Sequence, residues 1–267
     1  SKCRPDGERA VSNPLWTKMA VEELLLLDAD DFERAMKLYD GREDQRIVRF
    51  MIDTVEAMPP EVDRLYECLL ERMEKTYGAA AVRALASLMA LSRSGWRVSD
   101  FEAMLPVLSN SAWDPLRLAI LRRGFRAHVV MRGDPPRLDF FHARMRQAVL
   151  KRHLASADDR RAVHAVIAEH LGKLPGGDPL RRANYMHHLI GADDKKRAVN
   201  YYATAQGDDG DAARAALASA ILAGAAESPN PAIEWAISLL DVNTGDDYSD
   251  PIRRQILCQD FSLTLLE

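Results

Sequence analysis

The stretch FRAHVVMRGDPPRLDFF, residues 125–141, carries the strongest β-strand signal in this sequence. Residues 125–131 are rich in β-branched and other apolar side chains, and residues 138–141 can return as a partner strand. Between them, Gly-Asp-Pro-Pro at 133–136 supplies turn chemistry. We therefore expect one β-hairpin in this stretch.

Helical patterns surround the hairpin. Residues 62–77 place Leu65, Leu69 and Met73 on one helical face, and Gly78 is a natural C-cap. An Ala- and Leu-rich helix follows over 79–91, then a short helix with Ser99 as its N-cap, and then one that opens at Asp114-Pro115 and runs to Arg123. The last three of these helices, followed by the hairpin, are typical of a winged-helix subdomain.

The flanking segments are also expected to be helical. Residues 14–58 show helical spacing, begin with Pro14 at a first helical position, and end at a Pro-Pro pair. After Asp158 the pattern indicates helical hairpins, with breaks at 175–177, 191–194, 207–210 and 228–231. Helix pairs of this size resemble tetratricopeptide-type (TPR-like) repeats. The fold class is thus predicted as mainly α, in three parts: a helical subdomain (1–60), a winged-helix subdomain (61–155) and helical hairpins (156–267).

Composition limits the function classes. A net charge of -4, with 47% hydrophobic and 28% charged residues, indicates an ordinary folded domain without a wholesale nucleic-acid or membrane-surface role. The cysteines, Cys3, Cys68 and Cys258, form no CxxC pair. No apolar run approaches the roughly 20 residues that span a bilayer. We expect a cytoplasmic protein, and we interpret both ends of the sequence as boundaries within a longer one.

One motif suggests an enzyme, and we do not accept it. Residues 24–31, LLLLDADD, look like the strand and acidic residue that hold magnesium in P-loop ATPases, but the GxxxxGK[ST] loop is absent from this sequence. A helix end is expected there. No serine lies in a GxSxG elbow, so no catalytic residue is predicted.

The seven histidines do not indicate a metal site. His164 and His170 do not have the i, i+3 or i+4 spacing of two ligands on one helix face, and the adjacent pair His187-His188 points about 100° apart. Solvated or core histidines are expected. His142 differs, because it lies where the hairpin ends and the next helix begins, and helix N-termini collect anions.

A local excess of basic residues covers positions 117–152, with ten Lys or Arg against two Asp. Arg122, Arg123, Arg144 and Arg146 are candidate contacts to phosphate or nucleic acid. The stretch could bind DNA phosphates, a nucleotide or an acidic partner, or it could be a solvated surface. Leu116, Leu118, Ile120 and Leu121 make the helix before the hairpin apolar enough to be largely core, which disfavours DNA.

The order of these elements resembles STAND-class ATPases of NACHT and NB-ARC type, in the part that follows their P-loop domain. The similar stretches are residues 13–24, 65–78, 88–102, 140–149 and 184–190. By this resemblance, Pro14 corresponds to a proline against the adenine, with Asn13 in place of the family's glycine. His142 corresponds to a histidine that reaches the β-phosphate of ADP.

The resemblance implies a regulatory segment of a nucleotide switch in bacterial defence or signalling. ADP or ATP would bind in the longer protein, and this segment would not hydrolyse it. Its partners would be its own N-terminal nucleotide-binding domain, a protein ligand at the C-terminal repeats, and further copies of itself. Two alternatives stay open: a winged-helix DNA-binding regulator with a helical effector domain, and a TPR-like scaffold that binds peptides.

Overall fold

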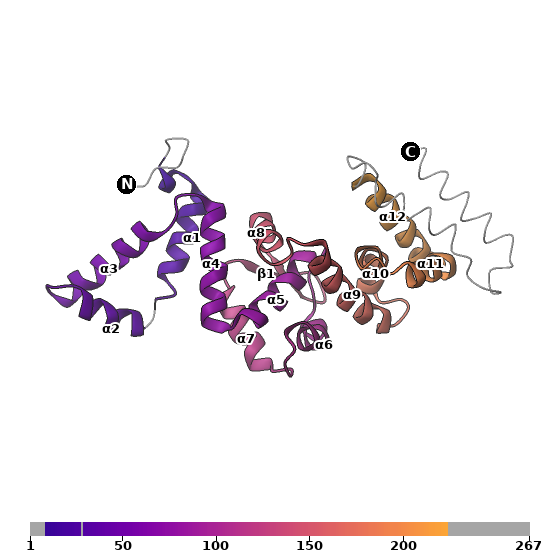
Figure 1. The fold of residues 1–267 in the computed structure, drawn as a ribbon, viewed down its shortest axis with the longest axis horizontal. Helices are drawn as coiled ribbons and strands as arrows, with labels where there is room; N and C mark the ends of the chain where they lie inside the picture. Colours follow the sequence, from indigo (N-terminus) through magenta and orange to yellow (C-terminus); the bar gives the residue numbers. More distant parts are fainter. Residues whose placement is uncertain (1–8, 28, 224–267) are drawn as a thin grey trace. The chain divides into compact units, whose positions relative to one another are not determined.

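The computed structural model describes residues 9–27 and 29–223 of the chain. In these residues it contains twelve α-helices, one short 3₁₀ helix and one two-stranded antiparallel sheet (Figure 1). The expectation of a mainly helical fold with one β-hairpin is confirmed. The described residues group into two compact units by their contacts. Unit 1 runs to Ala90 and includes Trp113–His153, and unit 2 comprises Leu91–Ala112 and the residues from Leu154 onwards.

Unit 1 begins with four short elements. They are the 3₁₀ helix Ala10–Ser12, α1 (Pro14–Leu24), α2 (Ala29–Leu38) and α3 (Glu43–Ala57). The side chain of Asn13 caps α1, because its Oδ1 accepts the N–H of Leu15 at 3.0 Å and that of Trp16 at 3.3 Å. Residues 24–27 close α1 rather than form a strand, as expected, and the N–H of Leu25 still bonds to the carbonyl of Val21.

The rest of unit 1 is built around α4. Its elements are α4 (Val62–Tyr77), α5 (Ala79–Leu91), α7 (Pro115–Gly124), β1 (Val129–Arg132), β2 (Arg137–Phe140) and α8 (Ala143–His153). Helix α4 packs against α1, α7 and α8. Its buried face holds Tyr66, Leu70 and Met73, which are at most 1% exposed. The chain leaves α4 at Gly78 with φ of 91°, a backbone conformation that favours glycine, as the sequence predicts.

The hairpin pairs Val129 with Phe140 and Arg132 with Arg137. Its first strand begins four residues later than the apolar run indicates. The reason is a turn over residues 125–128, closed by the N–H of His128 on the carbonyl of Phe125 at 2.7 Å. Phe125 is fully buried, so its apolar character serves the core rather than a strand.

Unit 2 is entirely helical in its described part. It contains α6 (Val98–Ser109), α9 (Ala157–Lys173), α10 (Pro179–Gly191), α11 (Lys195–Thr204) and α12 (Asp208–Ala223), with α10 packed against α9, α11 and α12 (Figure 1). The break predicted at 175–177 falls between helices, and the one at 191–194 begins at the last residue of α10. The break predicted at 207–210 lies at 205–207, because α12 already begins at Asp208, and the fourth lies outside the described residues. Helix α6 starts one residue before Ser99, with Arg97 at its N-cap position.

Two finer expectations stay predictions. Helix α6, the middle helix of the expected winged-helix subdomain, groups with unit 2 by its contacts. The TPR-like layout of α9–α12 and the domain boundaries after residues 60 and 155 stay predictions.

Of the three cysteines, the described residues include Cys68, a free and exposed thiol. Within the described residues, none of the helices combines the length and apolar character needed to cross a membrane.

Candidate functional site

His142 joins the hairpin to α8. It follows β2 by one residue, and its carbonyl accepts the N–H of Met145 in the first turn of α8 at 3.1 Å. Just before it, the N–H of Phe141 donates to the carbonyl of His128 at 2.8 Å, which extends the pairing of the hairpin. The backbone of His142 is therefore held on both sides, at the hairpin exit that the sequence predicts.

Helix α1 covers the His142 side chain. The residues around the imidazole come from α1 and from the turn before β1, namely Leu15, Lys18, Met19, Glu22, Ala127 and His128. The space between these side chains is too small for a water molecule. Lys18 Nζ also lies 4.9 Å from the centre of the Phe141 ring, a cation–π contact that holds α1 against the hairpin exit.

The His142 imidazole lies near both a positive and a negative side chain, Lys18 and Glu22. Burial, and then the charge of Lys18, lowers the pKa of His142, so its imidazole is neutral at pH 7. Its Nε2 is buried and has no hydrogen-bond partner among the described residues. An unpartnered imidazole nitrogen beside an ammonium group is a reasonable donor set for a phosphate. Because α1 fills the space, we assign no nucleotide contact to His142 in this arrangement.

Pro14 lies at the start of the helix that covers His142. It occupies the first turn of α1, where a backbone N–H would have no acceptor within the helix, so proline costs no hydrogen bond there. Its side chain is exposed. The next residue, Leu15, is one of those around the imidazole. The structure therefore brings the two positions predicted to bind nucleotide, Pro14 and His142, into one region of unit 1.

Arg146 has an internal role that the sequence does not reveal. Its Nη1 donates to the carbonyls of Met89 and Ala90, each at 2.6 Å, and its Nη2 pairs with Asp139 Oδ1 at 2.7 Å. The guanidinium thus satisfies the C-terminal carbonyls of α5 and ties α5 to β2. This geometry corrects the expectation that Arg146 is available for phosphate or nucleic acid. Arg144 is exposed and forms a longer pair of 3.4 Å with Asp63.

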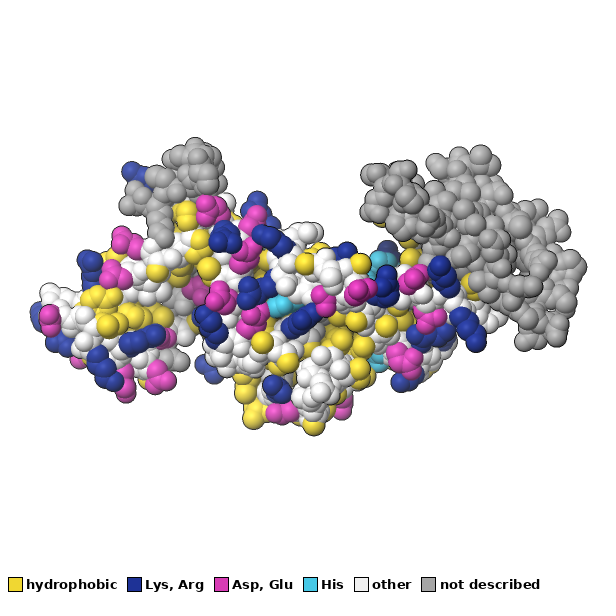
Figure 2. Space-filling model, in the orientation of Figure 1, with side chains coloured by type: hydrophobic (Ala, Val, Ile, Leu, Met, Phe, Trp, Pro, Cys, Tyr) yellow, Lys and Arg dark blue, Asp and Glu magenta, His cyan; other side chains and the backbone are white. Residues whose placement is uncertain are grey.

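Acidic residues of α4 pair with part of the basic stretch. Besides Arg144 and Arg146, Lys151 pairs with Glu67 at 2.6 Å and Arg152 pairs with Glu74 at 2.7 Å. Four of the ten basic residues in 117–152 therefore have carboxylate partners, three of them on α4, which the sequence places far away. Figure 2 shows Lys and Arg side chains interspersed with Asp and Glu side chains on the face it displays.

A basic groove lies between α7 and the hairpin. It has a volume of about 420 Å³ and is lined by Ala119, Arg122, Arg123, Arg126, Val129, Val130, Met131 and Leu138. Arg126 donates to the carbonyl of Leu25 at 3.4 Å. Among the described residues, Arg122 and Arg123 form no ion pair, so both guanidinium groups retain their capacity to bind an anion.

The apolar residues of α7 are only half in the core. Leu118 and Leu121 are buried as expected, but Leu116 is 66% exposed and Ile120 is 42% exposed. The expectation that this helix is largely core is therefore wrong for one face. The reason is that α7 uses a single face against α4, so its other face is left to solvent. The apolar residues of this helix therefore no longer count against DNA binding.

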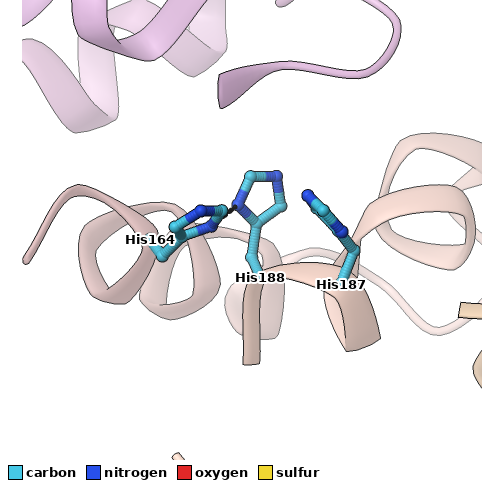
Figure 3. Close-up of side chains that lie close together, drawn as sticks. All are labelled: His164, His187 and His188. Carbon is cyan, nitrogen blue, oxygen red and sulfur yellow. Dashed lines mark hydrogen bonds between the residues drawn. The ribbon is translucent and has the colours of Figure 1, made fainter. Parts of the chain in front are cut away.

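Three histidines that the sequence separates meet in unit 2. His164 of α9 and His187 and His188 of α10 place one ring nitrogen each within 4.8 Å of the others (Figure 3). The spacing within each helix alone offers no shared site, but the packing of α9 on α10 brings the three imidazoles together. His170, by contrast, lies apart from this group, with Nε2 bonded to Asp100 Oδ1 at 2.9 Å. The sequence shows no metal-ligand motif for His164, His187 and His188, because these residues belong to two different helices.

No protein-family model, no curated protein and no solved structure matches this chain.

Proposed function

We propose that this chain is the regulatory segment of a STAND-class, NACHT-type nucleotide switch, in which a winged-helix subdomain and TPR-like hairpins act with a P-loop domain outside this sequence. ADP or ATP would bind in the longer protein. The C-terminal hairpins would relay a signal to or from a protein ligand, and copies of the protein would associate on activation. The context would be bacterial defence or signalling.

The observation that supports this proposal is the contact between α1 and His142. Two segments 128 positions apart, Pro14–Leu24 and the hairpin exit, meet at a neutral imidazole whose Nε2 lacks a partner. In the proposed switch, the packing with α1 over the imidazole is one of two states, and the other has α1 displaced from it. Nucleotide access to His142 requires that α1 move away.

The test uses the longer protein that carries both this chain and its P-loop domain. His142→Ala should weaken ADP binding at least about fivefold, the lower end of common coupling energies. Arg132→Ala is the matched control, because Arg132 is an exposed basic residue of the same hairpin. Equal ADP affinity in wild type and His142→Ala, or the absence of a P-loop upstream of Ser1, contradicts the proposal.

A second candidate function, DNA binding, is favoured by the groove between α7 and the hairpin. Arg122 and Arg123 line it without carboxylate partners in the described residues, and its apolar floor suits sugar and base contacts. The test is binding of duplex DNA over a range of salt concentrations. Replacing both arginines by alanine should weaken binding and reduce the slope of log K against log salt by about 1.8.

Arg144→Ala is the control for the DNA test. Arg144 is also exposed and basic, but it already pairs with Asp63 and lies outside the groove. The DNA function fails if wild type binds no duplex at low salt, or if Arg144→Ala has the same effect as the double variant.

A further inference from the structure

The histidine cluster is formed where α9 and α10 pack together in unit 2. His187 and His188 are adjacent on α10, and His164 reaches them from α9. The Nδ1 atoms of His164 and His188 are 2.8 Å apart, a hydrogen bond between two imidazoles. In Figure 3 the His188 ring stands between the other two, with one nitrogen toward His164 and the other on the side of His187. The ring centres are 4.9 to 5.6 Å apart.

A glycine makes room for this cluster. Gly191 ends α10 one turn after His187 and His188, and a Cβ placed there would come within 2.5 Å of His164 Nδ1. That distance is far shorter than any side-chain contact tolerates, so the His164 ring occupies the space that every other residue type would fill. The ring centre of Trp96, which is fully buried, lies 5.8 Å from that of His188. Neighbouring residues therefore pack closely around the cluster.

The three imidazoles, two of them buried and one half-buried, are in the neutral form that can donate an electron pair to a metal ion. Burial lowers the pKa of His164 and of His187 to about 4 and that of His188 well below its usual range, so all three are neutral at pH 7. His188 is 0% exposed, and its Nε2 has no hydrogen-bond partner. A buried polar atom without a partner costs stability unless a ligand satisfies it. The neutral imidazole is also the commonest metal ligand in proteins.

We propose that His164, His187 and His188 bind one divalent transition-metal ion of the zinc class. Tetrahedral zinc with bonds of about 2.0 Å holds its ligand nitrogens about 3.3 Å apart, so ion binding requires the separations, which are within 4.8 Å here, to shorten by up to about 1.5 Å. The described residues add no carboxylate or thiolate to the group, which leaves the fourth position to water or to an external ligand. His187 is half-buried, and it is the most exposed of the three histidines.

Two arginines oppose the ion. Arg93 lies near His187 and His188, and Arg160 lies near His164, and their charges help to keep the imidazoles neutral. A bound dication is repelled by the same charges. The site should therefore favour ions that bond strongly to imidazole, such as Zn²⁺ and Co²⁺, over Mg²⁺, which prefers oxygen ligands. This selectivity separates a metal site from a general attraction of cations.

The experiment measures Zn²⁺ uptake by the whole chain without an affinity tag. Wild type should bind one Zn²⁺ per chain in calorimetry and elemental analysis, and Co²⁺ should give the visible absorption of a tetrahedral complex with nitrogen ligands. Mg²⁺ should give no heat. His187→Gln should lower the Zn²⁺ affinity more than tenfold, since ligand loss exceeds the loss seen for supporting residues. His142→Gln, which removes an imidazole from unit 1, should bind like wild type.

A second variant tests the geometry without removing an imidazole. Gly191→Ala displaces His164 and should also weaken Zn²⁺ binding, while circular dichroism reports whether each variant stays helical. If a variant unfolds, the Co²⁺ spectrum of wild type decides alone. The proposal is overturned if wild type binds no stoichiometric Zn²⁺, if Co²⁺ stays octahedral, or if folded His187→Gln binds Zn²⁺ as wild type does.

Discussion

Arg97 and Asp178 form an ion pair in unit 2, with Nη1 and Oδ2 2.9 Å apart across 81 positions of sequence. Asp178 is the N-cap of α10, where its Oδ1 accepts the N–H groups of Leu180 and Arg181. Arg97 stands at the start of α6 and also binds Asp100. The pair therefore joins the N-termini of two helices that the sequence does not connect locally.

Arg97→Leu should destabilise unit 2 by about 3 kcal/mol, because it leaves the Asp100 carboxylate buried with fewer partners. Asp100 is 1% exposed. Burial alone would raise the pKa of Asp100, but hydrogen bonds from His170 and Arg97 outweigh it and lower that pKa. Urea unfolding followed by circular dichroism measures the loss. Arg161→Leu is the control, since its pair with Asp158 is largely exposed and is worth less than about 1 kcal/mol.

Arg146→Ala should lower the free energy of unfolding by about 2 to 3 kcal/mol, because it leaves two helix-end carbonyls and the Asp139 carboxylate without their donor. Arg144 lies two residues away on the exposed side of α8. Arg144→Ala should therefore change the free energy of unfolding by less than about 0.5 kcal/mol. Thermal or urea unfolding of the two variants checks this contrast. Equal stabilities would show that the internal contacts of Arg146 contribute nothing.

Gly124→Ala should destabilise unit 1 by about 1 to 3 kcal/mol through overpacking. A Cβ at this position would lie 2.5 Å from Met73 Cε and 2.7 Å from Tyr77 Cε2, where α7 meets α4. Gly177→Ala is the matched control, because a Cβ there meets nothing within 4 Å. Urea midpoints of both variants test the prediction, which fails if the two substitutions have the same effect.

Stability should fall as the pH drops from about 6.5 to about 4, in part because of His128. Burial, and then the charges of His142, Arg72 and Lys18, lowers the pKa of His128 to about 4. Between the folded-state pKa of about 4 and the unfolded-state pKa of about 6.5, only the unfolded chain binds this proton, so acid favours unfolding. The full effect of one such group is about 3 kcal/mol. The contribution is complete above pH 6.5.

The check compares urea unfolding of wild type and His128→Gln near pH 7 and near pH 5. Between pH 7 and pH 5 the free energy of unfolding of the variant should fall by about 2 kcal/mol less than that of wild type, because the other histidines titrate equally in both proteins. A variant with the same pH dependence as wild type would mean that His128 is not the buried neutral imidazole described here.

The sequence by itself determined the local elements. Asp114-Pro115 marks the start of α7 and Gly78 the end of α4, because caps and positive φ angles act within one helical turn. The turn residues 133–136 likewise specify the hairpin. The sequence could also place His142 at the hairpin exit, since that position follows from the order of neighbouring elements.

Only the tertiary structure decided which side chains meet. The basic stretch finds its carboxylates on α4, Arg146 turns inward to α5, and Leu116 stays exposed, each because of packing between helices distant in sequence. The cluster of His164, His187 and His188 likewise exists because α9 packs on α10. Helical periodicity fixes the direction of a side chain within its own helix, but not the neighbour that it contacts there, which depends on how the helices dock.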